Sequence, residues 1–217
     1  MRRALFLPAL ALAALPVLRA QTPRFELVLP PAAQRGNEVP AVRSDNLLVE
    51  EPLRELLRNG FPARLHYRME LWQAGGLFDH LKGQIEWDVI VRYNALERRY
   101  GAIRVEGERR EDRTGLGSYE QLRDLEDAIG RAFQPALRPP RPRERYYYAG
   151  TLRIEMLSVS DLDEVQRWLR GELGPAVRGE HSAGRAVGQG ARTLVARLLG
   201  GEERQYEART SIFRVTP

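Results

Sequence analysis

Alternation of apolar and polar side chains along most of two stretches of about ten residues is the feature that most constrains this fold. In residues 63–72 every second side chain is apolar, namely Leu65, Tyr67, Met69 and Leu71. Residues 84–93 repeat the pattern with Ile85, Trp87, Val89, Val91 and Tyr93. Such period-two alternation is typical of a strand with one buried and one wet face, as in antiparallel sheets. We therefore expect an antiparallel sheet around these two strands.

Shorter alternating patterns predict four further strands. They cover residues 25–29, 100–106, 146–157 and 204–215. Residues 94–99 are a short connection, so the strand over 84–93 and the strand over 100–106 are expected to form a hairpin. Residues 30–44 contain Pro, Gly and Asn and are interpreted as a loop.

Helical periodicity predicts three or four helices between these strands. The segment 47–58 and the stripe Leu122, Leu125, Ile129 and Phe133 have helical spacing, and Ser118 with Gln121 matches a capping box. Residues 160–172 and 191–199 are also interpreted as helices. The expected class is α+β: a mostly antiparallel sheet or sandwich of about six strands, flanked by three or four helices.

Residues 1–20 have the pattern of a secretory signal peptide. Arg2 and Arg3 precede an apolar stretch over residues 4–18, and Ala20 is the expected cleavage position. The apolar stretch is shorter than the roughly 20 residues that span a bilayer as a helix. We therefore expect export to the periplasm or the cell exterior, with residues 21–217 as one extracytoplasmic α+β domain without a transmembrane segment.

Composition excludes several classes of site. The 217 residues include no cysteine, which excludes disulfides, thiolate metal sites and a cysteine nucleophile. The net charge of +5 falls to +2 when the three arginines of residues 1–20 are left out. Basic and acidic residues are interspersed, so no nucleic-acid partner is expected. His66, His80 and His181 are interpreted as solvated side chains, and we expect neither a metal site nor a cofactor.

Two groups of residues are candidates for a site. Arg141, Arg143, Tyr146 and Tyr147 lie in a segment that interleaves Arg and Pro with tyrosines, and Arg and Tyr are enriched at recognition surfaces. Glu86 and Asp88 lie on one face of a strand, and paired carboxylates can catalyse glycoside hydrolysis. Cross-strand ion pairing with arginines is the competing interpretation of the two carboxylates.

The chain from about residue 25 to 217 resembles a bacterial family of exported proteins, the domain of unknown function family 4390. The motifs that carry the resemblance are Gly60-Phe61-Pro62 before a strand that ends at Trp72, the segment Val91–Leu96 before Tyr100, and the long strand from Tyr146. The resemblance implies no activity. Members are often encoded near envelope sensor kinases, which implies an accessory role in signalling with a sensor kinase as a possible partner.

The expected function is a non-enzymatic binding or accessory protein of the bacterial cell envelope. Its contact surface would be a sheet edge or the segment that holds Arg141, Arg143, Tyr146 and Tyr147. Two alternatives stay open. One is a cell-wall or glycan hydrolase that uses Glu86 and Asp88, and the other is a carrier of an apolar ligand between the sheet and the helices.

Overall fold

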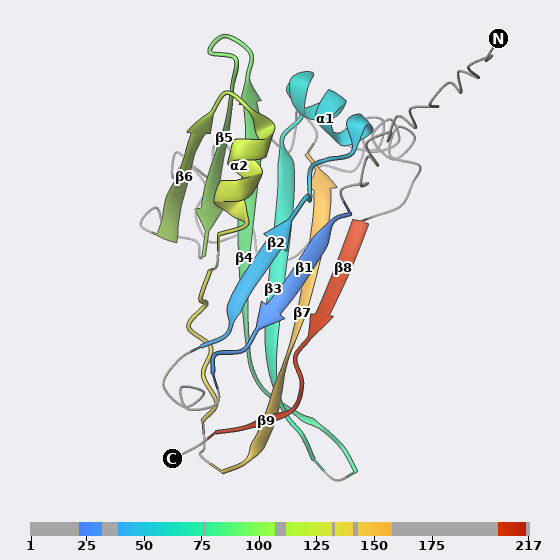
Figure 1. Cartoon of the computed structure of the whole chain (residues 1–217), viewed down its shortest axis with the longest axis vertical. Coiled ribbons are helices and arrows are strands. Elements are labelled where there is room, and N and C mark those ends of the chain that lie inside the picture. The colour runs from blue at the N-terminus through green and yellow to red at the C-terminus, as the bar shows by residue number, and fades with distance from the viewer. Residues whose placement is uncertain are drawn as a thin grey trace, which may run out of the picture.

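A long antiparallel sheet of seven strands dominates the structure, which is a computed structural model. The structure describes residues 22–31, 39–75, 77–106, 112–131, 133–140, 143–157 and 204–215. Its strands are β3 (Ala63–Gln73), β4 (His80–Asn94), β5 (Arg99–Val105), β6 (Arg113–Tyr119), β7 (Arg145–Met156), β8 (Arg204–Arg209) and β9 (Phe213–Arg214). The order is β6-β5-β4-β3-β7-β8, and β9 pairs with β7. β4 has 15 residues, which corresponds to a length of about 50 Å. The sheet is therefore long and narrow (Figure 1).

Alternation along the central strands separates a buried inner face from a wet outer face. On β3 the buried side chains are Ala63, Leu65, Tyr67, Met69 and Leu71, each at most 3% exposed. β4 adds Trp87, Val89 and Val91 to the same core, and β7 adds Tyr146, Tyr148, Leu152 and Ile154. Each side chain here follows the two-residue period of a pleated strand. The expected inner faces of the strands over 63–72, 84–93 and 146–157 are thus confirmed.

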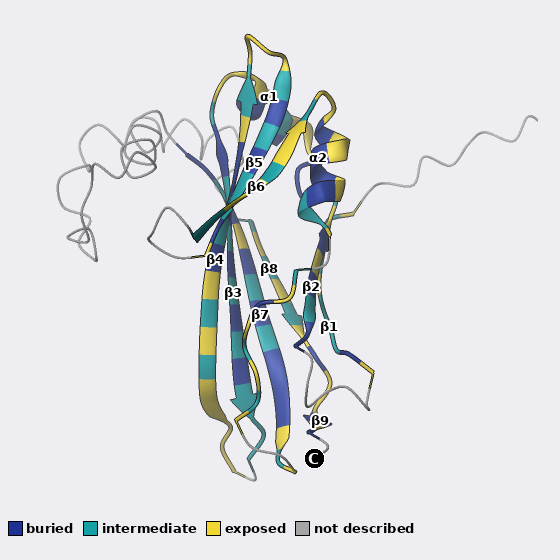
Figure 2. Cartoon of the chain, turned by 90° about the vertical axis from the view of Figure 1, so that its left-hand side faces the viewer, coloured by how far each residue is buried: buried dark blue, intermediate teal, exposed yellow. Residues whose placement is uncertain are grey.

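A second layer covers the inner face. β1 (Arg24–Val28) and β2 (Ala41–Asp45) form a separate two-stranded antiparallel sheet, which lies to one side of β3 and β7 (Figure 2). The layers approach closely at Gly150 of β7. A Cβ atom there would lie 3.0 Å from Phe25 Cζ and 3.1 Å from Leu27 Cδ1. A side chain at this position would push the two sheets apart.

Two short helices complete the described part of the chain. α1 (Glu51–Arg58) buries Leu53, Leu56 and Leu57, and Gly60 follows it at φ 89°, a conformation that glycine adopts without strain. α2 (Leu122–Ile129) lies against β5 and β6 (Figure 1). The carboxylate of Glu126 on α2 accepts a 2.6 Å hydrogen bond from the backbone N–H of Leu48. This bond ties α2 to the segment that precedes α1.

The expected α+β class is wrong. Strands make up 54% of the described residues and helices 13%, in two helices rather than three or four, so the structure is mostly antiparallel β. Residues 41–44 were expected in a loop but belong to β2, and residues 113–119 form an unpredicted strand, β6. β2 has only five residues, and its buried side chains pack against residues from other parts of the chain. Its own sequence therefore gives little indication of a strand. The helices expected at 160–172 and 191–199 lie outside the described residues.

The helix expected from the Ser118 capping box is also shorter and differently capped. Ser118 belongs to β6, and the N-cap is Gln121 without a side-chain hydrogen bond. The helix ends at Ile129 because Gly130 passes so close to β2 that a Cβ atom there would lie 2.3 Å from the Ser44 carbonyl oxygen. Phe133 is therefore not helical. It forms a β-bridge with Val42 through two backbone hydrogen bonds of 2.7 and 3.1 Å.

Candidate functional site

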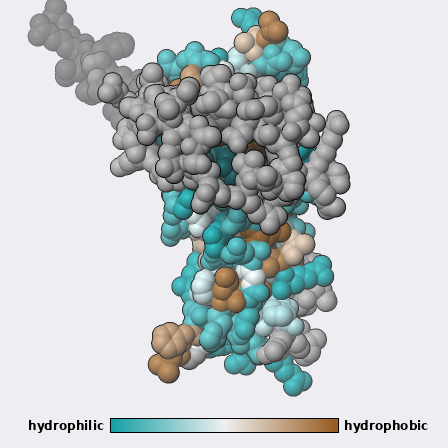
Figure 3. Space-filling view, turned by 180° about the vertical axis from the view of Figure 1, so that it is seen from behind, coloured by the Kyte–Doolittle hydropathy of each residue, from teal (hydrophilic) through white to brown (hydrophobic). Residues whose placement is uncertain are grey.

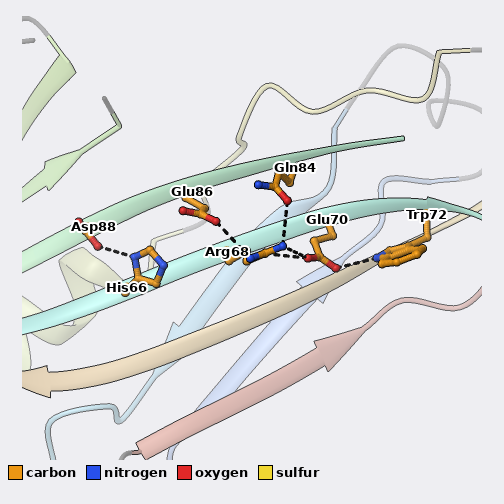
Figure 4. Close-up of polar contacts among 7 residues, drawn as sticks. All are labelled: His66, Arg68, Glu70, Trp72, Gln84, Glu86 and Asp88. Carbon is orange, nitrogen blue, oxygen red and sulfur yellow. Dashed lines mark hydrogen bonds and ion pairs between the residues drawn. The ribbon is translucent and has the colours of Figure 1, made fainter. Parts of the chain in front are cut away.

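The carboxylates of Glu86 and Asp88 lie on the outer face of β4, beside the basic residues of β3. The register pairs His66 with Asp88 and Arg68 with Glu86. Asp88 Oδ1 lies 2.8 Å from His66 Nδ1, and Asp88 Oδ2 accepts a 2.8 Å bond from Arg64 Nη2. Both oxygens of Asp88 are therefore engaged in cross-strand contacts, and Figure 4 shows the one with His66.

These contacts shift the proton affinity of Asp88. Burial alone raises the pKa of this carboxyl, but the hydrogen bonds from His66 and Arg64 outweigh burial, so the pKa lies below its ordinary value. A general acid in glycoside hydrolysis needs a raised pKa. Asp88 is thus held as an ionised acceptor and not as a proton donor.

Arg68 extends the polar ladder along β3. Its Nε donates a 2.8 Å hydrogen bond to Glu70, its Nη2 donates one of 2.9 Å to Gln84, and its Nη1 lies 3.6 Å from Glu86. Glu70 in turn accepts a 2.8 Å bond from Trp72 Nε1. Figure 4 shows these side chains in one row along the outer face. The row gives Glu86 a part in an ion-pair network, as the cross-strand interpretation predicts.

The structure does not bring the four candidate residues of the Arg/Tyr segment together on one surface. Arg141 lies outside the described residues. Arg143 is exposed at φ 69°, and its backbone N–H donates to the Val215 carbonyl at 3.0 Å. Tyr146 is 0% exposed and packs on Phe213 with ring centroids 6.4 Å apart. Tyr146 is therefore a core residue.

Tyr147 points to the opposite face of β7. Its ring stacks on Trp72 at 6.4 Å between centroids, and the Arg209 guanidinium lies 3.8 Å from the centre of the Tyr147 ring. The Tyr147 hydroxyl donates a 2.9 Å hydrogen bond to Asp79 Oδ2. Burial, followed by this bond to a carboxylate, raises the pKa of Tyr147. The same bond is the main cause that lowers the pKa of Asp79.

Three exposed apolar side chains lie where the β3–β4 hairpin turns. Leu77 is 93% exposed, Phe78 is 76% exposed and Leu81 is 44% exposed. Leu81 is the register partner of Trp72, and Asp79, which follows Phe78 in the chain, contacts Tyr147 and Arg209. We call this whole group the tip surface: Trp72, Leu77, Phe78, Leu81, Tyr147 and Arg209. Figure 3 shows hydrophobic side chains projecting at the lower corner of an otherwise mostly hydrophilic lower half.

Asp79 connects the turn that carries Leu77 and Phe78 to two other parts of the structure. Asp79 Oδ1 accepts a 3.1 Å bond from the backbone N–H of Gly75, while Oδ2 accepts the bond from Tyr147. A Cβ atom on Gly75 would lie 1.8 Å from the Phe78 carbonyl oxygen, so only glycine fits. Sequence reasoning missed this site. Its signal was two apolar residues in a turn, where polar residues are usual.

A cleft of about 250 Å³ opens between the large sheet, β2 and α2. It is lined by Val42, Ser44, Tyr67, Trp87, Val89, Arg104, Gly115, Leu116, Ala128, Ile129, Arg131 and Phe133. The sequence carries no local signal for this cleft, because its walls come from segments up to about 90 positions apart.

Two classes of feature are missing from the described part of the chain. There, no group of three or more His, Asp or Glu side chains is placed to hold a metal ion. Neither α1 nor α2, the helices described, is long and apolar enough to cross a membrane.

Comparisons with known proteins return nothing similar. A scan against protein-family models, a search of curated proteins and a search of solved structures each find no match for this chain. The resemblance to the exported family 4390 thus rests on the sequence motifs alone.

Proposed function

We propose that the protein is a non-enzymatic binding or accessory protein of the bacterial cell envelope that contacts a protein partner through the tip surface. Placement in the envelope rests on the signal-peptide pattern of residues 1–20. A sensor kinase is the partner that the family resemblance favours. The observation that carries the contact surface is the exposure of Leu77 and Phe78 on a turn fixed by Asp79.

The composition of the tip surface matches that of protein-binding sites. A single exposed leucine is common on protein surfaces, and Leu96 in the β4–β5 turn is such a case at 96% exposure. The tip surface differs because its apolar side chains adjoin Trp72, Tyr147 and Arg209, and Trp, Tyr and Arg are the residue types that dominate interface energies. A turn that is ordered before binding also loses less conformational entropy when it binds.

The contacts of the outer-face carboxylates Glu86 and Asp88 do not favour the hydrolase alternative. Both oxygens of Asp88 are bound by Arg64 and His66, and its lowered pKa favours the ionised form. A hydrolase would need one carboxyl group of the pair to keep its proton near neutral pH. The ion-pair ladder therefore favours a structural role for Glu86 and Asp88.

Site-specific crosslinking of the full-length protein in its own cells tests the proposal. Phe78 is replaced by p-benzoylphenylalanine, the cells are irradiated, and adducts are identified by mass spectrometry. A discrete protein adduct is expected from position 78. The matched control is the same replacement at Leu96, an equally exposed turn residue, from which that adduct should be absent.

A second variant connects the adduct to the tip surface. Arg209→Gln in the Phe78-substituted protein should reduce the adduct about tenfold or more, because arginines at the centre of an interface contribute strongly to binding. Identical adducts from positions 78 and 96, or an adduct that Arg209→Gln leaves unchanged, would overturn the proposal. Urea denaturation of each variant confirms that the fold is kept.

A further inference from the structure

The cleft between the large sheet, β2 and α2 has an aromatic inner wall. Tyr67 and Trp87 stack face to face, with centroids 5.0 Å apart and planes at 5°. Phe133 meets Trp87 edge-on at 5.0 Å and 63°. Tyr67 and Trp87 are 3% and 5% exposed, so the inner wall is rigid and largely apolar. Such a wall suits a flat apolar group.

One polar pair lies deep in the same cleft. Ser44 Oγ and the Tyr67 hydroxyl are 3.2 Å apart, and Ser44 is 7% exposed. Burial raises the pKa of Tyr67 to about 12, although the hydrogen bond with Ser44 opposes the shift. The hydroxyl is therefore neutral at physiological pH and adds no negative charge to the cleft.

Two arginines, Arg104 and Arg131, supply the charged part of the lining. Arg104 lies with its guanidinium 3.9 Å from the centre of the Phe133 ring, and its Nε donates a 2.9 Å bond to Glu106. Its two terminal nitrogens have no hydrogen-bond partner within the described chain. Arg131 also lines the cleft and has neither a hydrogen bond nor an ion pair with any described residue. Among the described residues that line the cleft, none is acidic.

We propose that this cleft binds a small molecule with a flat apolar body and one anionic group, such as a carboxylate, phosphate or sulfonate. The apolar body lies against the aromatic wall, and the anionic group is bound by Arg131 and the terminal nitrogens of Arg104. The volume of about 250 Å³ is below the ~300 Å³ of the smallest sites for drug-sized ligands, so the ligand has one or two rings. This site is separate from the tip surface and does not depend on the proposed partner.

Binding of 2-naphthoate to the purified protein tests the inference. The ligand is titrated while amide and indole resonances are followed by NMR. We expect saturable shifts at the Trp87 indole N–H and at Ser44 and Gly115, with a dissociation constant of about 1 mM or tighter. 2-Naphthamide, which has the same rings without the charge, should bind about tenfold more weakly.

Two variants locate the anion site. Arg131→Gln should weaken 2-naphthoate binding about tenfold and leave 2-naphthamide binding unchanged. The matched control is Arg123→Gln, on an exposed position of α2, which should leave both affinities unchanged. Shifts that avoid the cleft, equal affinity for the two ligands, or 2-naphthoate affinity that Arg131→Gln does not change would each overturn the inference.

Discussion

Single residues on the outer face of the sheet act as one polar ladder rather than as separate chemical groups. Asp88 is more enclosed than Glu86: 24% of the Asp88 side chain is exposed, against 42% for Glu86. Asp88 accepts two hydrogen bonds from basic groups of β3, and Glu86 has one ion pair at 3.6 Å. Hydrogen bonds to charged groups contribute more to stability than exposed ion pairs do. The two carboxylates should therefore differ in their effect on stability.

Asp88→Asn is expected to lower the free energy of unfolding at pH 7 by about 1–2 kcal/mol. The pKa of Asp88 is lower in the folded than in the unfolded protein, so its stabilising effect is complete above the unfolded value. The effect is lost as the pH falls below 3.8 and through the folded pKa. Urea denaturation at several pH values should show the two proteins converging in acid.

Glu86→Gln is the control for this prediction. It should change the free energy of unfolding by less than about 0.5 kcal/mol, because the Arg68 contact is long and exposed. A loss of stability for Asp88→Asn that persists in acid, or an equal loss for Glu86→Gln, would contradict the ladder described here.

At the scale of elements, the turn of the β3–β4 hairpin has its own anchor on a neighbouring strand. Asp79 joins the turn at Gly75 to Tyr147 on β7, and Arg209 of β8 lies 3.9 Å from the same carboxylate. These contacts lie outside the hydrophobic core. They should control the order of the turn without controlling the stability of the whole sheet.

Asp79→Ala should release the turn while the protein stays folded. Hydrogen exchange of the Gly75 amide should become faster, because this amide loses its acceptor, Asp79 Oδ1. The midpoint of urea denaturation should stay nearly unchanged, as for substitutions at other exposed positions. Glu97→Ala, an exposed position in the β4–β5 turn, is the control and should leave Gly75 exchange unchanged. Unchanged exchange in Asp79→Ala would show that the carboxylate does not anchor the turn.

At the scale of the whole molecule, stability depends on how closely the two sheets pack. Gly150 marks a close approach of the two sheets, where Phe25 and Leu27 of β1 occupy the space that a side chain would fill. Gly101 of β5 provides a contrast within the same sheet. A Cβ atom there would meet only the Gly117 carbonyl oxygen, at an ordinary distance of 3.7 Å.

Gly150→Val should therefore lower the free energy of unfolding by about 1–3 kcal/mol, the usual effect of overpacking a core. Gly101→Val should have little effect or a small stabilising one, because valine favours extended backbone. Thermal or urea denaturation of the two variants under the same conditions makes the comparison. Equal effects would mean that the layers are not packed at Gly150 as described.

Much of the central sheet could be predicted from the sequence. The inner faces of β3, β4 and β7 follow from alternation, and the β4–β5 hairpin follows from its short connection. α1 follows from the helical spacing of Leu53, Leu56 and Leu57. These features are local, because the period of apolar residues along one segment determines which face of that segment can be buried. Of the candidate site residues, Tyr146 and Tyr147 are both buried, at 0% and 7% exposure, which the sequence did not predict.

The features that only the tertiary structure decided arise from contacts between residues that are distant in the sequence. β2 owes its strand conformation to pairing with β1 and a bridge to Phe133, and α2 ends where Gly130 meets the backbone of Ser44. The ionised state of Asp88, the anchored turn at Asp79 and the basic aromatic cleft likewise arise from contacts between separate strands. Sequence periodicity determined which segments become strands with one buried face. Packing of those strands determined which side chains meet. The free energy of a contact between two side chains depends on both residues, and the partner of a side chain on another strand is not one of its neighbours in the sequence.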